Sequence, residues 1–260
     1  MKLYKKEDKD VMGSRVEAWC RGSFAHTLRQ AQNASTLFKI LLSASLIFFL
    51  SACGGKNTPA DTQQQEANKD TTASTSNKKV ILFFGDSLTA GYGLDDPSNA
   101  FPGVIERKID SLQLPYAVTN AGVSGETTAG GLARIDWILK QRVDIFVLEL
   151  GANDGLRGIP VTETTKNLQS IIDKVKTRYP EAKIILTGMQ VPPSMGNDYI
   201  TSFKNLFPAL AEKNKIALVP FLLAGVGGNS KLNQADGIHP TAEGAKIVAN
   251  NVWKVLKLEL

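Results

Sequence analysis

Two short stretches of the sequence hold residue types that could carry out nucleophilic catalysis. The first, FFGDSLTAGYG (residues 83–93), is an apolar run that ends at Gly-Asp-Ser. The second, DGIHPTAEG (residues 236–244), contains Asp236 and His239. A serine is a weak nucleophile until a base removes its proton. The chain's only other histidine lies near its N-terminus, so we expect Ser87 to be the nucleophile and His239 its base.

The spacing of Asp236 and His239 suits a catalytic pair. In a turn, a carboxylate three residues before a histidine can reach the imidazole and hold Nδ1 in its protonated form. Nε2 then faces the serine hydroxyl. The same Asp-x-x-His spacing also suits a turn that caps the last predicted helix, so the pair taken alone fits both interpretations.

Three further groups could stabilise a developing oxyanion. The backbone N–H of Ser87 lies at the start of a predicted helix, where unpaired amides favour negative charge. Gly122, in NAGVSG, would let its backbone N–H approach a ligand closely. Asn153, in GANDG, offers a side-chain amide. Taken separately, Gly122 could also be a turn glycine and Asn153 an Asx-turn residue.

The elements that must position these groups alternate regularly from residue 78 onward. Apolar runs predict strands at 79–86, 116–123, 143–151, 182–190 and 216–221. Helical candidates lie near 99–112, 127–141, 161–179, 198–214 and 240–257. Near-continuous apolar strands are typical of a parallel sheet covered on both faces. The pattern therefore predicts a single α/β domain with a doubly wound sheet of about five strands, and a site at their carboxyl ends.

Taken together, the motifs resemble those of the GDSL, or SGNH, hydrolases. The matching blocks are GDSLTAGYG, NAGVSGETT, LGANDGLRG and DGIHPTAEG, and the resemblance covers residues 79–253. It is closest to the bacterial periplasmic branch described as multifunctional thioesterase, arylesterase and lysophospholipase. It implies a three-layer α/β/α, flavodoxin-like fold and ester hydrolysis without a metal or an organic cofactor. The implied catalytic residues are Ser87, Asp236 and His239, and the implied oxyanion hole is formed by Ser87, Gly122 and Asn153.

Two other functions stay open at this stage. One is removal of acetyl groups from a carbohydrate, and the other is a tethered, non-catalytic flavodoxin-like binding module. For an esterase we expect a small or lipid-derived ester as the substrate and a monomeric domain. Met189–Ile200 is the predicted wall of the acyl groove, or alternatively a plain connecting loop. Three polar residues near the motifs are predicted to have turn or loop roles rather than catalytic ones: Asp86, Ser124 and Asp154.

Composition excludes several other kinds of function. The net charge of +5 comes mostly from residues 1–52, which hold 8 Lys/Arg and 4 Asp/Glu, so the remainder carries 22 − 21 = +1. The domain thus has no electrostatic signature for binding nucleic acid. Both cysteines, Cys20 and Cys53, precede the domain. A disulfide or a cysteine-based zinc site within the domain is therefore excluded.

The N-terminal region has the features of a lipoprotein leader. An apolar segment at 40–50 is short for a membrane span and ends in LSAC, which resembles the bacterial lipoprotein box. We therefore expect residues 1–52 to be a signal peptide, Cys53 to be lipidated, and 53–77 to be a disordered tether to the domain at 78–260. This places the domain on the periplasmic side of a bacterial membrane. Alternatives are an uncleaved anchor or an ordinary signal peptide with an incidental cysteine, and the true start could be Met12.

Overall fold

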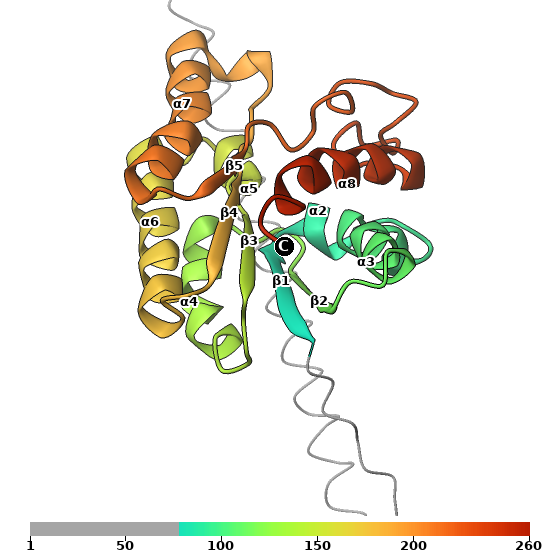
Figure 1. The fold of residues 1–260 in the computed structure, drawn as a ribbon. Coiled ribbons are helices and arrows are strands. Elements are labelled where there is room, and N and C mark those ends of the chain that lie inside the picture. The colour runs from blue at the N-terminus through green and yellow to red at the C-terminus, as the bar shows by residue number, and fades with distance from the viewer. Residues whose placement is uncertain (1–77) are drawn as a thin grey trace, which may run out of the picture. The chain divides into compact units, whose positions relative to one another are not determined.

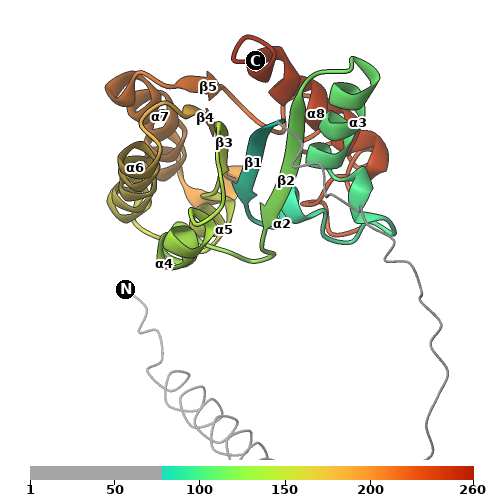
Figure 2. The same ribbon diagram turned by 60° about the horizontal axis from the view of Figure 1, so that its bottom comes forward.

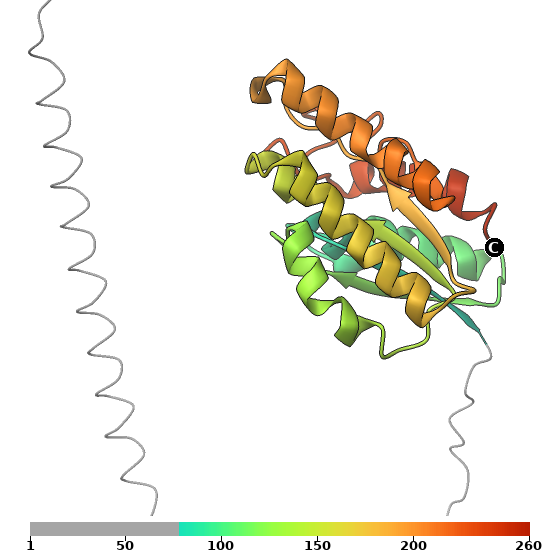
Figure 3. The ribbon, with the colours of Figure 1, turned by 90° about the vertical axis from the view of Figure 1, so that its left-hand side faces the viewer.

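The computed structural model describes residues 78–260, which form a three-layer α/β/α domain (Figure 1). The predicted signal peptide, Cys53 and the tether lie outside the described residues. Figure 2 shows α4, α6 and α7 on one side of the central sheet and α3 and α8 on the other. In Figure 3, which faces the first of these layers, the three helices run side by side. The predicted fold class is confirmed.

The sheet has five parallel strands in the order β2-β1-β3-β4-β5. The strands are β1 (Lys79–Gly85), β2 (Tyr116–Gly122), β3 (Ile145–Glu149), β4 (Lys183–Thr187) and β5 (Ala217–Val219). The chain moves outward from β1 to β2 and then returns to place β3 on the other side of β1. In sheets with such a reversal, ligands usually bind beyond the carboxyl ends of the strands where the order reverses, here β1 and β3.

The helices agree with the predicted ones to within a few residues, and the helix predicted to start at Ser87 is present as a single short turn. The long helices are α3 (Phe101–Ser111), α4 (Thr128–Ile138), α6 (Val161–Arg178), α7 (Asn197–Asn214) and α8 (Ala242–Leu256). Short helices α2 (Ser87–Ala90) and α5 (Ala152–Leu156) follow β1 and β3, and the 3₁₀ turns are η1 (Pro97–Asn99) and η2 (Pro193–Met195). The sequence predicted a loop where α5 lies. Gly151, at φ 120°, turns the chain into that helix.

The core lies on both faces of the central strands. Every residue of Ile81–Phe84 in β1 and of Phe146–Leu148 in β3 is fully buried. Each such side chain stabilises the fold by about 1.5–3 kcal/mol relative to an exposed one. Among the helices of residues 78–260, none has the length and hydrophobicity needed to span a bilayer.

Candidate active site

Ser87 lies where β1 ends and α2 begins. The Asp86 carboxylate accepts a hydrogen bond from the Leu88 N–H (3.0 Å) and so caps α2, which confirms its predicted turn role. Helix α2 stops after one turn at Gly91, whose φ of 81° favours glycine. This tight strand–helix junction leaves Ser87 8% exposed at the sheet edge. Ser87 is the first residue of α2, so its backbone N–H has no carbonyl partner within the helix.

His239 is held by the loop that follows β5. The Gln234 N–H donates to the His239 carbonyl (2.7 Å), and Asn233 and Pro240 form an antiparallel bridge. Gln234 also donates through Nε2 to the carbonyl of Tyr92 (2.8 Å). The Tyr92 ring lies 4.7 Å from the imidazole between centroids. These contacts fix the imidazole beside α2, and neither Tyr92 nor Gln234 was singled out from the sequence.

The structure brings Ser87, His239 and Asp236 into one hydrogen-bonded chain. Nε2 of His239 lies 2.8 Å from Ser87 Oγ, and Nδ1 lies 2.6 Å from Asp236 Oδ2. The other Asp236 oxygen accepts from the backbone N–H groups of Ile238 (2.9 Å) and His239 (3.0 Å). These hydrogen bonds, the one from the imidazole above all, lower the pKa of Asp236 to about 2. The ionised Asp236 accepts a hydrogen bond from the protonated Nδ1, which leaves Nε2 as the base.

The capping interpretation of Asp236 is wrong. Helix α8 starts at Ala242, and its cap is Thr241, whose hydroxyl accepts from the Gly244 N–H at 3.2 Å. Asp236 is therefore committed to the turn around His239 and not to the helix.

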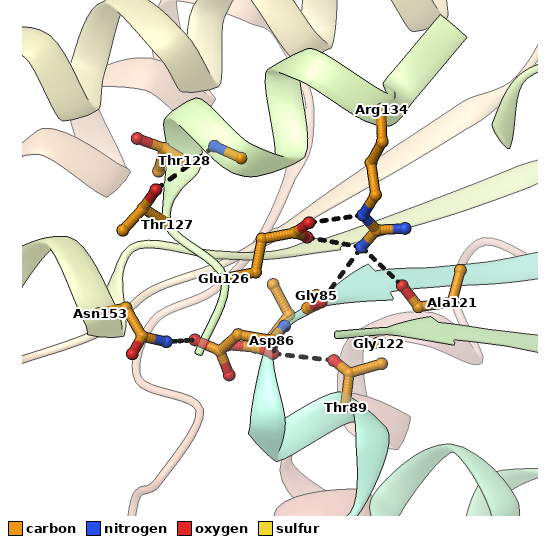
Figure 4. Close-up of polar contacts among 12 residues, drawn as sticks. Gly85, Asp86, Thr89, Ala121, Gly122, Glu126, Thr127, Thr128, Arg134 and Asn153 are labelled. Atoms are coloured by element: carbon orange, nitrogen blue, oxygen red, sulfur yellow. Dashed lines mark hydrogen bonds and ion pairs between the residues drawn. The ribbon is translucent and has the colours of Figure 1, made fainter. Parts of the chain in front are cut away.

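Asn153 faces the nucleophile turn from helix α5. Its Nδ2 donates to the Asp86 carboxyl (3.1 Å), as Figure 4 shows. An amide nitrogen carries two hydrogens, so one remains available for a substrate oxygen. The next residue, Asp154, is buried and accepts from the Thr128 N–H (2.8 Å) and the Thr128 hydroxyl. Asp154 thus fixes α5 against α4, which confirms its predicted structural role.

Gly122 does not offer the predicted oxyanion donor in this structure. Its N–H donates to the side chain of Asn120 (3.0 Å). A Cβ at Gly122 would collide with the backbone of Ala90 in α2, so the glycine is required for close packing of that helix on β2. The sequence correctly marked Gly122 as a position that needs glycine, but the need comes from helix packing and not from an oxyanion donor.

A second glycine, Gly125, lies in the same loop. The Val123 N–H donates to the carbonyl of Gly85 (2.9 Å), and the Glu126 N–H donates to the carbonyl of Val123 (3.1 Å). Gly125 lies between them with a φ of 78°. Its carbonyl accepts from Arg157 (2.9 Å), which ties the loop to the segment that follows α5. Gly125 thus lies in the loop beside the Asn153 helix.

An ion pair supports this edge of the sheet. Arg134 pairs with Glu126 (2.6 Å) and donates to the carbonyl of Ala121 (2.8 Å), while its guanidinium lies 4.0 Å from the centroid of the Phe84 ring. Figure 4 shows the guanidinium between Glu126 and the ends of β1 and β2. This clamp was not predicted from the sequence, because a charge pair eight residues apart resembles any exposed pair.

The cavity that touches Ser87 and His239 is small and apolar. It has space for about one water molecule and lies between α2, α3 and the start of α8, where Phe101 and Val248 line it. Met189–Ile200, the predicted groove wall, is not among its lining residues, and Met189 and Val191 are buried in the core. Within residues 78–260, no group of three or more His, Cys, Asp or Glu side chains could hold a metal ion.

Comparison with known proteins adds to this geometry. Residues 83–247 match the model of the GDSL-like lipase/acylhydrolase family. The chain is 41% identical over 180 residues to "Esterase TesA" of Pseudomonas aeruginosa, covering 69% of this chain and 88% of that protein. It is 36% identical over 181 residues to "Thioesterase 1/protease 1/lysophospholipase L1" of Escherichia coli K12 (69% and 83% covered). The structure of the Pseudoalteromonas esterase EstA inhibited by monoethylphosphonate matches with a TM-score of 0.65 and 32% identity, covering 70% of this chain and 98% of that one.

Proposed function

The chain belongs to the GDSL-like lipase/acylhydrolase family, and on that premise we propose that it hydrolyses carboxylic esters and thioesters through an acyl-enzyme on Ser87. The observation that carries this proposal is the contact of 2.8 Å between Ser87 Oγ and His239 Nε2. A hydroxyl and an imidazole at that distance can exchange a proton directly.

In the first half of the reaction, Nε2 of His239 takes the hydroxyl proton as Ser87 Oγ attacks the carbonyl carbon. Asp236 stabilises the imidazolium that forms. The imidazolium then protonates the departing alcohol or thiol, and the acyl group stays on Oγ. In the second half, the same imidazole takes a proton from water, the hydroxide attacks the acyl carbon, and the proton returns to Ser87 as the acid leaves.

The negative oxygen formed in both halves needs donors in place. We assign this role to the Ser87 N–H, the second amide hydrogen of Asn153 and the N–H of Gly125. The first two follow the sequence prediction, whereas Gly125 replaces Gly122 because the Gly122 N–H is used by Asn120. Fixed donors of this kind cost no reorganisation during the reaction, which is why each is worth several kcal/mol.

The surface around the site fits acyl substrates. Four of the exposed large apolar residues lie on the loops and short helices that carry the candidate residues: Tyr92, Val123, Leu156 and Ile238. The cavity under the serine is too small to enclose a chain. An acyl chain would therefore lie along this exposed apolar rim, which favours esters with an aromatic or lipid-derived part. The relatives named esterase, thioesterase and lysophospholipase are consistent with such substrates.

A substrate panel tests the proposed specificity. Aryl esters and acyl thioesters of increasing chain length should be hydrolysed with a much higher kcat/KM than acetylated sugars, because only the former can cover the apolar rim. The measurement is the initial rate for each substrate with the full domain. A higher kcat/KM for acetylated sugars would favour the carbohydrate esterase instead, and no turnover of any ester would leave a binding module.

We further propose that the protein is a lipoprotein on the periplasmic side of a bacterial membrane. The support is the LSAC sequence at residues 50–53 behind an apolar segment of signal-peptide length. Mass spectrometry of the protein from membrane extracts should find the mature N-terminus at Cys53 with an attached lipid. The Cys53→Ser variant should leave the membrane fraction. An unmodified thiol at Cys53 in membrane-extracted protein would contradict the proposal.

A further inference from the structure

A buried carboxyl lies behind the nucleophile turn and takes no part in the mechanism above. Glu149 is the last residue of β3 and is 1% exposed. Its Oε2 accepts from the backbone N–H of Asp86 (3.1 Å) and from the hydroxyl of Thr89 (2.8 Å). Asp86 directly precedes Ser87, and Thr89 lies two residues after it. Glu149 therefore holds both ends of the nucleophile turn through hydrogen bonds that do not involve Ser87.

Asp86 continues this chain of contacts toward the oxyanion side. It is fully buried, and its carboxyl accepts from the Leu88 N–H and from the amide of Asn153. A Cβ at Gly85 would collide with the Glu149 carboxyl and the Thr89 hydroxyl, so the glycine is what admits this arrangement. The contacts thus run from Glu149 through Asp86 to Asn153.

Both carboxyl groups are buried. The Asp86 N–H donates to Glu149 Oε2 at 3.1 Å, so the two residues lie in one buried region, and two buried carboxyls at close range favour a proton on one of them. Oε1 of Glu149 has no N–H or O–H partner among residues 78–260, which leaves it for that proton. Burial, together with the nearby Asp86 charge, raises the pKa of Glu149 well above its usual range. Burial raises the pKa of Asp86 to about 6.

Neither carboxyl is ion-paired with a cation in the part of the chain that the structure describes. None of the ion pairs within residues 78–260 includes Glu149 or Asp86. The Arg134 guanidinium on α4 is paired with Glu126. His239 has the smallest of the effects on the pKa of Asp86, which it lowers. Its hydrogen bonds go to Ser87 and Asp236. The remaining nearby acid, Asp154, accepts from Thr128 on α4.

We propose that Glu149 and Asp86 share one proton and that this carboxyl pair positions the Ser87 turn and the Asn153 amide. At neutral pH, Glu149 keeps the proton on Oε1 and donates a hydrogen bond through it to the Asp86 carboxylate. Asp86 stays ionised and accepts from Leu88 and Asn153. Glu149 is a positioning residue, since it acts on the reacting atoms only through Asp86 and Thr89. The inference rests on the proposed function, because positioning matters only if Ser87 and Asn153 act on a substrate.

The shared proton can be observed directly. Infrared difference spectra of the wild-type domain at neutral pH should show the C=O band of a buried, protonated carboxylic acid. The Glu149→Gln variant should lack this band. As the pH falls through about 6, a second such band should appear as Asp86 takes up its own proton. Absence of the first band from the wild-type protein would overturn the proposal, and this readout needs no substrate.

Variants test the positioning role. Glu149→Ala removes both contacts to the turn and should lower kcat by about 10²-fold with little change in KM, since small misplacements of reacting groups have effects of that size. Glu149→Gln keeps an acceptor for Asp86 and Thr89 and a donor toward the Asp86 carboxylate, so it should restore most of the lost turnover. Asp86→Asn cannot accept all three hydrogen bonds and should remain impaired.

Thr187→Val is the matched control. Thr187 follows Leu186, the partner of Leu148, so it lies beside Glu149 on the neighbouring strand. Its buried hydroxyl makes no hydrogen bond within residues 78–260, so it does not hold the nucleophile turn. Its replacement should leave kcat unchanged. Equal losses in Glu149→Gln and Glu149→Ala would overturn the proposal while leaving the esterase intact. An active Ser87→Ala variant would instead remove the proposed function, whatever the infrared result. Circular dichroism of each variant identifies any that fail to fold.

Discussion

Replacing Ser87 with alanine should reduce ester hydrolysis by about 10⁴–10⁶-fold and leave the domain folded. The hydroxyl is the group of Ser87 that becomes acylated, and its oxygen lies 2.8 Å from Nε2 of His239. Alanine retains the backbone N–H and suits the first turn of α2. The loss should therefore fall on kcat, while binding of the ester and the circular dichroism spectrum remain close to those of the wild-type protein.

The matched control for this variant is Ser124→Ala. Ser124 lies exposed in the loop between β2 and α4, near the site but outside the hydrogen-bonded chain. Its loss should change the rate of aryl ester hydrolysis by less than about twofold, as is usual for exposed positions away from special features. Wild-type turnover by Ser87→Ala, or a large loss in Ser124→Ala, would reject Ser87 as the nucleophile.

Replacing His239 with alanine should have an effect of similar size. Without the imidazole, the Ser87 proton has no acceptor and the leaving group has no acid. Because the two residues act as one unit, the double variant Ser87→Ala/His239→Ala should be no slower than either single variant. The measurement is kcat/KM for an aryl ester in all three variants. Losses that multiply in the double variant would show that the two residues act independently.

The pH dependence of activity depends on the hydrogen-bonded chain of Ser87, His239 and Asp236. Hydrogen bonds from His239 and Ile238 lower the pKa of Asp236 to about 2, from the ordinary value of 3.8. Asp236 therefore stays ionised as the pH falls through 4, and its contribution to folding is lost progressively as the pH falls from about 4 to about 2. A loss of aryl ester turnover as the pH falls from 7 to 4, measured as kcat against pH, should accordingly not come from protonation of Asp236.

Residue types and spacing were enough to predict the fold and the central pair. Apolar strands alternating with amphipathic helices define the parallel sheet, and its topology brings Ser87 and His239 together across 152 positions of the chain. With one histidine in the domain, the choice of base followed by elimination. Asp236 was ambiguous until Thr241 was seen to cap α8.

Other features depended on packing that a sequence does not state. Gly122 has the residue type of an oxyanion donor, but the backbone of α2 lies against it and its N–H is used by Asn120. Met189–Ile200 stays a predicted groove wall, but Met189 and Val191 within it pack into the core, which its composition did not indicate. The sequence does hold a signal for Glu149, although it was not used. An acidic residue inside the apolar run IFVLELG is unusual unless it has buried partners.

The most direct test of the account is to label the enzyme with an aryl alkylphosphonate and locate the adduct by peptide mass spectrometry. Such a reagent reacts with an activated serine and loses its aryl alcohol, so one phosphonyl group should be found on Ser87, with activity lost in proportion. Labelling should be far slower in His239→Ala. An adduct on a different residue, or full inactivation with Ser87 unmodified, would contradict the central claim.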